Sequence, residues 1–311
     1  MNSSISGHGY KLLNILDTKI LICDGAMGTE LLSRGFSGYP DSANLEQAGI
    51  EKIIDIHLSY LDAGSNIIQT NTFGANPEKL KSYSLDSKII DINKNAAAAA
   101  MQAIKRHEST KNYPGPHFVA GDIGPLGKLL EPSGTLKYGQ AVDSFLRQTE
   151  VLVESGVDLL LIETIMDINE ALAAAEAARR SSRDIPLACT LSFGENGITL
   201  MGNKAEDAVK ALLDSGCDIV GANCSIGSDS MLEVVKKMRD AYPAARLIFQ
   251  PNAGLPVLKE GKTIYNETPE IMASNIKKYL EYKPSIIGAC CGSTPAHISA
   301  IKDFIFSVSS K

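Results

Sequence analysis

Eight short apolar runs recur along the chain, and each is followed by a polar or glycine-containing turn and then by a helical pattern. The runs are rich in Ile, Val and Leu. Near-continuous apolar strands that alternate with helices are typical of a parallel sheet covered by helices. Eight such units in 311 residues predict an α/β fold, a closed (β/α)8 (TIM) barrel, with a doubly wound open sheet as the competing architecture. The runs begin at Lys19, Asn66, His117, Val157, Pro186, Asp218, Arg246 and Ser285.

No linker rich in Pro, Gly or Ser divides the sequence, so we expect residues 1–311 to form a single domain, with the barrel itself at about 19–308. The segments after the first three strands are longer than the later ones, at 34–50, 73–86 and 124–138. Segments that follow barrel strands lie at the C-terminal face, where barrel enzymes keep their active sites. We therefore expect the active site at that face.

Composition and capping residues predict three helices. Residues 91–106 are rich in Ala and end with basic residues, and 167–180 consists of strong helix formers with two Arg near the end. Thr294 followed by Pro295 marks a capped last helix that extends to Val308.

The charge balance and the N-terminal sequence bear on which partners and which cellular location are expected. The chain has 30 basic and 36 acidic side chains, a net charge of −6, and no Lys/Arg run, so nucleic acid is not expected as a partner. The N-terminus lacks a basic stretch followed by an apolar core, so we expect neither a signal peptide nor a membrane anchor. A cytoplasmic protein is the prediction.

Six cysteines are too few for a secreted disulfide scaffold, so in a reducing compartment they are core residues, nucleophiles or metal ligands. Cys23, Cys189 and Cys217 lie in or beside apolar segments, where a buried and inert thiol is the ordinary expectation.

The other three cysteines follow barrel strands, Cys224 after the sixth and Cys290 and Cys291 after the eighth. Adjacent residues of a strand point to opposite faces, so Cys290 and Cys291 can both bind one ion only where the chain leaves strand geometry. Gly292, the next residue, favours such a departure. Three thiolates suit zinc and leave its fourth position for substrate or water. Such a site keeps a substrate thiolate nucleophilic, which indicates sulfur alkylation. An accidental cluster of buried thiols is the alternative.

Seven motifs, in the same order, resemble those of the homocysteine S-methyltransferase family, and the resemblance runs from about residue 19 to 305. TNTFGAN together with GDIGP is most similar to the N-terminal homocysteine-binding module of cobalamin-dependent methionine synthase. The motifs are DGAMGTEL at Asp24, QTNTFGAN at Gln69, GDIGPLG at Gly121, IETIMDINEA at Ile162, GANCSIG at Gly221, QPNAGLP at Gln250 and GACCGSTPAHI at Gly288.

The resemblance implies a (β/α)8 barrel in which Cys224, Cys290 and Cys291 bind one Zn²⁺ and the sulfur of L-homocysteine completes the tetrahedron. It implies methyl transfer to that sulfur, which forms methionine. The same three cysteines are thereby the expected catalytic residues.

The resemblance also implies which residues bind the amino acid end of homocysteine. Asp24 and Glu163 match the family's acidic contacts to the homocysteine ammonium, with a helix cap or a structural ion pair as the alternative role. Asn252 is expected to hydrogen-bond the substrate or to occupy the metal's open position. Backbone amides of the glycine-rich turns at 25–29 and 72–74, the latter with Thr72 and Phe73, are expected to receive the carboxylate.

The methyl donor is the open part of this prediction. Similarity to methionine synthase implies a methylcorrinoid, methylcobalamin carried by another polypeptide or by a missing part of a longer protein. Other family members use S-methylmethionine or a betaine; the absence of Trp disfavours an aromatic cage for betaine, although Tyr39, Tyr60 and Tyr83 keep it open. A module that binds homocysteine or zinc and acts only with a corrinoid partner is the alternative from another class.

Three further candidates are weaker. Asp55 and His57 resemble the D-x-H-x-x-G signature of a cobalt ligand, but Tyr60 stands where that signature has Gly. His297 is expected to be a surface or capping residue, since a fourth protein ligand would close the zinc site. Lys128 is the nearest candidate for a Schiff-base lysine of an aldolase-like barrel, a reading that we disfavour.

Overall fold

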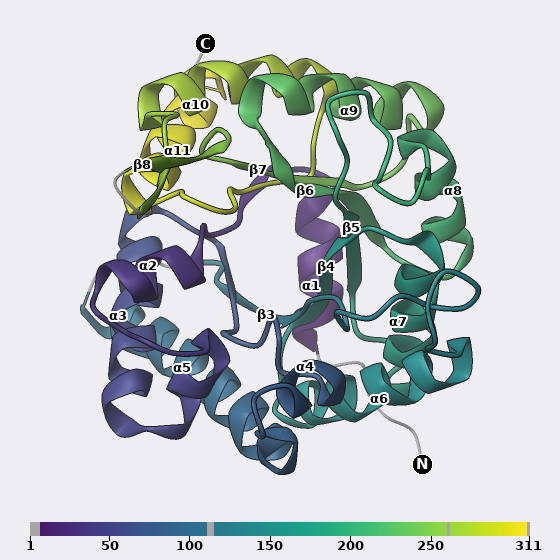
Figure 1. The fold of residues 1–311 in the computed structure, drawn as a ribbon. Coiled ribbons are helices and arrows are strands. Elements are labelled where there is room, and N and C mark those ends of the chain that lie inside the picture. The colour runs from purple at the N-terminus through teal and green to yellow at the C-terminus, as the bar shows by residue number, and fades with distance from the viewer. Residues whose placement is uncertain (1–6, 111–114, 260–261, 310–311) are drawn as a thin grey trace.

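The computed structural model describes residues 7–110, 115–259 and 262–309; residues 1–6, part of the segment on which the lack of a leader was inferred, lie outside it. Eight parallel strands form one sheet in the order β1–β10–β7–β6–β5–β4–β3–β2 (Figure 1). A parallel bridge between Cys23 and Ile67 joins its two ends, which confirms the predicted (β/α)8 barrel. The strands are β1 (Leu21–Ile22), β2 (Ile67–Gln69), β3 (Phe118–Ile123), β4 (Leu159–Ile165), β5 (Leu187–Leu191), β6 (Ile219–Gly227), β7 (Leu247–Asn252) and β10 (Ile286–Ile287).

The helices surround the barrel and bury their apolar faces against the outside of the strands. The expected helices at 91–106, 167–180 and 294–308 are present as α5, α7 and α11. The helices are α1 (Gly7–Leu16), α2 (Met27–Ser33), α3 (Gln47–Ala63), α4 (Pro77–Lys81), α5 (Ile89–Thr110), α6 (Tyr138–Glu154), α7 (Ile168–Ser181), α8 (Ala205–Asp214), α9 (Ser228–Ala241), α10 (Pro269–Lys277) and α11 (Pro295–Ser309), with 3₁₀ turns η1 (Pro40–Leu45), η2 (Asp86–Lys88) and η3 (Lys278–Tyr282).

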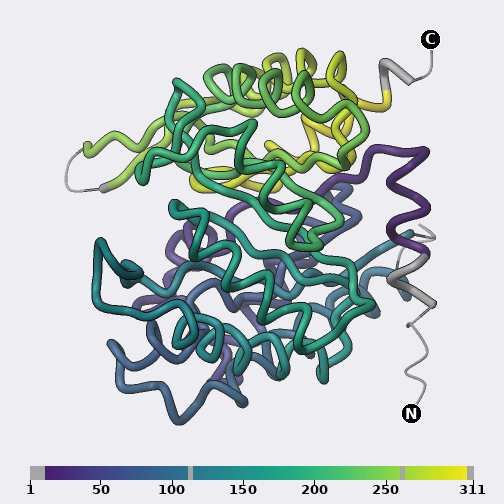
Figure 2. Tube along the Cα trace, turned by 90° about the vertical axis from the view of Figure 1, so that its right-hand side faces the viewer, coloured from purple at the N-terminus to yellow at the C-terminus, as the bar shows by residue number. Residues whose placement is uncertain are grey.

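Helix α1 closes the N-terminal end of the barrel. Leu12 and Leu16 belong to the same buried cluster as the strand residues that fill the barrel interior, among them Phe118 and Leu161. Figure 2 shows α1 at the opposite end of the barrel from the hairpin of β8 (Pro256–Lys259) and β9 (Lys262–Tyr265). The barrel is therefore sealed at one end, and access to its interior is from the C-terminal face.

The sequence analysis did not predict α1 or the β8–β9 hairpin. Helix α1 precedes the first strand and gains its apolar partners only when the barrel is closed. The hairpin strands have four residues each and no buried apolar face, so they carry no run that distinguishes them from a loop. In the described ranges, no helix is both long and apolar enough to cross a membrane.

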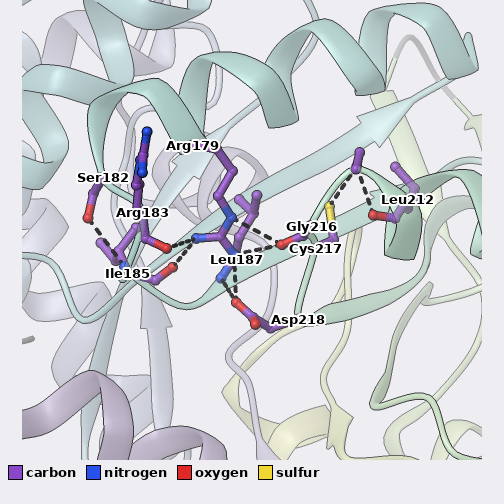
Figure 3. Close-up of polar contacts among 10 residues, drawn as sticks. Arg179, Ser182, Arg183, Ile185, Leu187, Leu212, Gly216, Cys217 and Asp218 are labelled. Carbon is purple, nitrogen blue, oxygen red and sulfur yellow. Dashed lines mark hydrogen bonds and ion pairs between the residues drawn. The ribbon is translucent and has the colours of Figure 1, made fainter.

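Arg179, in the last turn of α7, holds the N-terminal end of the barrel together (Figure 3). Its guanidinium donates to the carbonyl oxygens of Gly216 at 2.7 Å and Ile185 at 2.7 Å, and to the Asp218 carboxylate at 2.7 Å. These acceptors lie in the turns that enter β5 and β6. The planar Arg179 guanidinium thus donates to carbonyl groups in both turns. These carbonyl groups lie outside the helices and have no partner within a helix.

Replacement of Arg179 with Met should lower the free energy of unfolding by about 2–4 kcal/mol, because several charge-assisted hydrogen bonds are lost and their acceptors are left unpaired. Arg180→Met is the matched control, since Arg180 is exposed and pairs only with Glu176 one turn away. We expect less than about 0.5 kcal/mol for the control. Urea unfolding measures both; equal losses would contradict the assigned role of Arg179.

Candidate active site

The barrel interior changes from apolar to polar towards its C-terminal end. Along β3, the inward residues are Phe118, Ala120 and then Asp122, and along β4 they end with Leu161 and Glu163. The same change occurs at the ends of β2, β5, β6 and β7, which contribute Gln69, Thr190, Asn223 and Gln250. A ring of polar side chains therefore forms the floor of the open end, above the apolar plug.

Cys224 reaches this floor because β6 departs from regular strand geometry. Cys224 and Ser225 have φ values of 60° and 62°, in the left-handed region that non-glycine residues rarely adopt. The register between β6 and β7 shifts at the same place, between Asn223 and Gly227. Adjacent residues of a regular strand face opposite sides, so this departure explains how Asn223 and Cys224 both serve the open end.

Cys290 and Cys291 lie in the turn after β10, where the chain has already left the strand, as the sequence analysis required. The Cys290 amide donates to the Pro251 carbonyl at 2.8 Å, and the Ala253 amide donates to the Cys291 carbonyl at 3.0 Å. Gly292 has φ of 78°, and a Cβ there would lie 2.0 Å from the ring of Tyr265 on β9. Only glycine therefore fits behind the cysteine pair.

The three sulfurs are spaced as one metal ion requires. Cys224 Sγ lies 3.8 Å from Cys291 Sγ, Cys290 Sγ lies 4.0 Å from Cys291 Sγ, and all three are within 4.8 Å of one another. Zn–S bonds of about 2.3 Å at tetrahedral angles place sulfurs about 3.8 Å apart. The donor set therefore fits a tetrahedral thiophilic ion with one position left open. Hydrogen bonds from Cys224 and Cys290 lower the pKa of Cys291, which favours a thiolate in the cluster.

A cavity of about 370 Å³ opens beside the cluster and is lined by all three cysteines. Four carboxylates also line it, and the only cationic side chain among the lining residues described is Lys79. Burial raises the pKa of Asp24 to about 7 and that of Glu163 to about 8. The carboxylates are Asp24, Asp41, Asp122 and Glu163.

Asn223 connects the carboxylates to the cysteines, and the sequence analysis missed it. Its amide donates to Glu163 Oε2 at 3.1 Å and contacts Cys290 Sγ at 3.9 Å, while its Oδ1 accepts from Thr190 Oγ1 at 2.7 Å. The fully buried amide thus fixes the orientation of Glu163 relative to the cluster. The sequence predicted a role for its neighbour Cys224. The inward position of Asn223 could not be predicted, because it depends on the register of β6.

The predicted substrate-contact residues divide into two groups. Asp24, Glu163 and Phe73 line the cavity, whereas Thr72 and Asn252 are buried and do not line it. Thr72 Oγ1 donates to the Asp122 carbonyl at 2.7 Å, and Asn252 Oδ1 has no partner among the described residues. The roles of all five in substrate binding stay predictions.

The two glycine-rich turns differ in the amides they offer. In the turn at 72–74, the Thr72 amide donates to the Thr70 carbonyl at 2.8 Å and the Gly74 amide to Asp41 Oδ1 at 2.9 Å. In the turn at 25–29, which enters α2, the Ala26 amide donates to Ser293 Oγ at 3.1 Å, and all five residues of the turn line the cavity. The second turn is therefore the better candidate for receiving a carboxylate.

The weaker candidates lie away from the cluster. His297 caps α11, with Nδ1 accepting from the Thr294 amide at 3.1 Å and Nε2 3.0 Å from the Glu267 carbonyl, so it has the expected capping role, although it is buried rather than on the surface. His57 is fully buried in α3, and Lys128 pairs with Glu78.

The three tyrosines do not form a cage. Tyr39 lines the cavity and stacks on Tyr83, with ring centroids 3.9 Å apart, while Tyr60 is fully buried and donates to the Ala26 carbonyl at 2.9 Å. The cysteines expected to be inert, Cys23, Cys189 and Cys217, are free and buried as predicted.

This geometry defines the class of protein. It is a barrel with a cluster of three cysteines at its C-terminal face, beside an open cavity. The profile of the family described as homocysteine S-methyltransferase matches residues 21–305. The chain belongs to the homocysteine S-methyltransferase family.

Known proteins agree with this assignment. The chain is 29% identical over 303 residues to the methionine synthases of Mycobacterium tuberculosis (strain ATCC 25618 / H37Rv) and Mycobacterium leprae (strain TN), covering 93% of this chain but only 25% and 24% of theirs. It thus spans about a quarter of their length. The homocysteine methyltransferase MmuM from Escherichia coli has the same fold: its oxidized form superposes with a TM-score of 0.80 at 23% identity, covering 94% of this chain and 99% of MmuM.

The burial of Asp41 predicts a pH-dependent stability. Burial raises the pKa of this carboxyl from 3.8 to about 7. Below about pH 4 it is protonated in the folded and unfolded states alike, between about 4 and 7 only the unfolded state ionises, and above 7 both do. Its contribution to the free energy of unfolding therefore falls as pH rises through that window, by up to about 4 kcal/mol.

Asp41→Asn should remove this contribution, so the variant should gain stability relative to the unchanged protein between pH 4.5 and 7.5. Urea unfolding at several pH values measures the difference. Asp143→Asn, on the exposed side of α6, is the control and should give no such trend. A difference between Asp41→Asn and the unchanged protein that is independent of pH would contradict the assignment.

Proposed function

We propose that this protein is a zinc-dependent methyltransferase that transfers a methyl group to the sulfur of L-homocysteine and forms methionine. The observation that carries the proposal is the convergence of the Cys224, Cys290 and Cys291 sulfurs, all within 4.8 Å of one another, on the wall of a cavity that also holds Asp24 and Glu163. The thiophilic cluster suits the thiol of the substrate, and the carboxylates suit its ammonium.

The three cysteines are the residues that would hold zinc. When bound there, zinc would supply a Lewis acid that keeps the substrate sulfur a nucleophilic thiolate at neutral pH. The chain itself would position the amino acid end of the substrate: Glu163 is held by Asn223, and residues 25–29 line the cavity. Holding both ends fixes the direction from which the sulfur attacks the donor carbon. A reducing compartment such as the cytoplasm keeps these thiols free.

The donor in this proposal is a methylcorrinoid carried by another polypeptide or another part of a longer protein. Similarity to methionine synthases supports this choice. The C-terminal face also exposes large apolar side chains on several loops that surround the cavity, which suits docking of a bulky donor. They are Leu32, Phe73, Met166, Leu200 and Leu255, exposed by 36–83%.

A small cationic donor is the second candidate, and the cavity itself favours it. The lining holds four carboxyl groups and one lysine, and a bound sulfonium such as S-methylmethionine would stabilise the ionised form of those carboxyl groups. Betaine is less favoured because the chain has no Trp and its three candidate tyrosines do not converge.

Cys290→Ser should remove most of the bound zinc, because a hydroxyl is a far poorer ligand for zinc than a thiolate. Zinc content per chain after dialysis, measured by atomic emission, tests this. Cys217→Ser is the control and should retain zinc, since Cys217 is buried away from the cluster beside Ser215. Full zinc stoichiometry in the Cys290 variant would refute the ligand assignment.

A donor competition tests the reaction itself. Zinc-loaded protein is incubated with homocysteine and a mixture of methylcobalamin, S-methylmethionine and betaine, each with a differently labelled methyl group. We expect labelled methionine whose mass identifies methylcobalamin as the donor. Label from S-methylmethionine instead would establish the second candidate, and homocysteine binding without any product would favour a binding module that needs a corrinoid protein partner.

A further inference from the structure

Asp122, at the C-terminal end of β3, is a buried carboxylate that neither the sequence analysis nor the family resemblance gave a role. It is 6% exposed and lines the cavity. Its Oδ1 is buried and has no hydrogen-bond partner among the described residues. Burial and the negative charges of Glu163, Asp41 and Asp24 raise the pKa of Asp122 well above its usual range. An unpaired carboxylate in such a place costs stability unless something from outside pairs with it.

The other carboxylates of the cavity already have donors within the protein. Asp24 accepts from the Gln69 amide at 2.9 Å with one oxygen and from Gln69 Nε2 at 2.9 Å with the other. Asp41 accepts from the Gly74 amide at 2.9 Å, and Glu163 accepts from Asn223 at 3.1 Å. Asp122 has only the adjacent Ile123 amide to lower its pKa. Asp122 is thus the carboxylate least compensated by the protein.

The backbone that carries Asp122 is held in place. Its amide donates to Thr70 Oγ1 at 3.0 Å, and its carbonyl accepts from Thr72 Oγ1 at 2.7 Å. Gln148 donates to the same carbonyl at 3.4 Å and to the Thr72 carbonyl at 2.8 Å. These contacts fix the main chain and leave the carboxylate free to face the cavity, as expected for a binding group positioned in advance.

We propose that Asp122 directly accepts a hydrogen bond from the ammonium group of the amino acid substrate, together with Glu163, and that Asp24 acts mainly by orienting Gln69. This inference rests on the proposed function, which supplies an amino acid with a thiol. It adds a substrate-binding residue and changes Asp24 from a contact to a positioning residue.

The test compares two ligands that differ only in the ammonium. L-Homocysteine and 4-mercaptobutanoate share the thiol and the carboxylate, and calorimetry measures the binding of each to zinc-loaded protein. Asp122→Asn should weaken homocysteine binding about 10- to 100-fold, as expected for loss of a charge-assisted hydrogen bond, and change 4-mercaptobutanoate binding less than about 3-fold. Asp143→Asn, the same substitution on an exposed carboxylate of α6 that does not line the cavity, is the control and should affect both ligands little.

A second readout separates binding from structure. Asp122→Asn should not lower the melting temperature of the ligand-free protein, because Asp122 Oδ1 makes no hydrogen bond to the described residues that the substitution could remove, whereas a lower melting temperature would mean that weaker binding reflects a structural change. If the Asn variant does not fold, Asp122→Ser gives the same ligand comparison. Glu163→Gln should weaken homocysteine binding and Asp24→Asn should weaken it less than Asp122→Asn.

Each outcome has one meaning. Unchanged homocysteine affinity in Asp122→Asn, equal losses for both ligands, or an equal loss in Asp143→Asn would overturn the role of Asp122 while leaving the proposed function intact. Failure of the unchanged zinc-loaded protein to bind homocysteine would overturn the proposed function, and the role of Asp122 with it.

Discussion

The left-handed backbone at Cys224 is the constraint on which the site depends. A regular β6 would direct either Asn223 or Cys224 away from the open end, and the cluster would have two sulfurs or Glu163 would lose its amide partner. The strained conformation costs of order 1–3 kcal/mol and persists because the surrounding contacts hold it. Thr164 on β4 has a similar φ of 61°, and its amide donates to Asn223 Oδ1 at 2.8 Å. The two irregular strands therefore support each other.

A second constraint is the distribution of charge in the barrel. The interior is apolar at the α1 end and acidic at the open end, so the cavity carries several buried carboxylates with few internal donors. Such an arrangement destabilises the free protein and stabilises a complex with a cation, because the same desolvated charges that repel each other gain full compensation from a bound ammonium. The same buried carboxylates thus favour binding of a cation and lower the stability of the free protein. The raised pKa values of Asp24 and Glu163 reflect the cost of ionising them in the free protein.

The sequence predicted the parts of the structure that are continuous in the chain. Each of the eight apolar runs contains a barrel strand, and the three cysteines meet at one rim, although Cys224 lies in the irregular part of β6 and not after the strand, where the sequence had predicted it. It did not predict Asn223, Gln69 or Asp122, because their importance comes from facing inward at the ends of strands whose register was unknown. A signal was present for Asp122: it follows Phe118 and Ala120 at intervals of two, so it continues an inward series. Helix α1 and the β8–β9 hairpin depend on long-range contacts or lack an apolar face, and local patterns cannot indicate them.

The closed end of the barrel limits the route by which the substrates of the proposed reaction would enter. Because α1 and the apolar layer seal the N-terminal side, both homocysteine and the donor must enter from the C-terminal face. The cysteines of the cluster and the carboxylates line the same cavity, so in the proposed reaction a homocysteine that contacts both would lie along the wall between them. A protein-bound corrinoid has to approach over the exposed apolar rim, whereas a small sulfonium has to share the acidic cavity with the first substrate. Leu32 and Phe73 belong both to the rim and to the cavity lining, so the two surfaces adjoin, and the part that the donor contacts would distinguish the two proposed reactions.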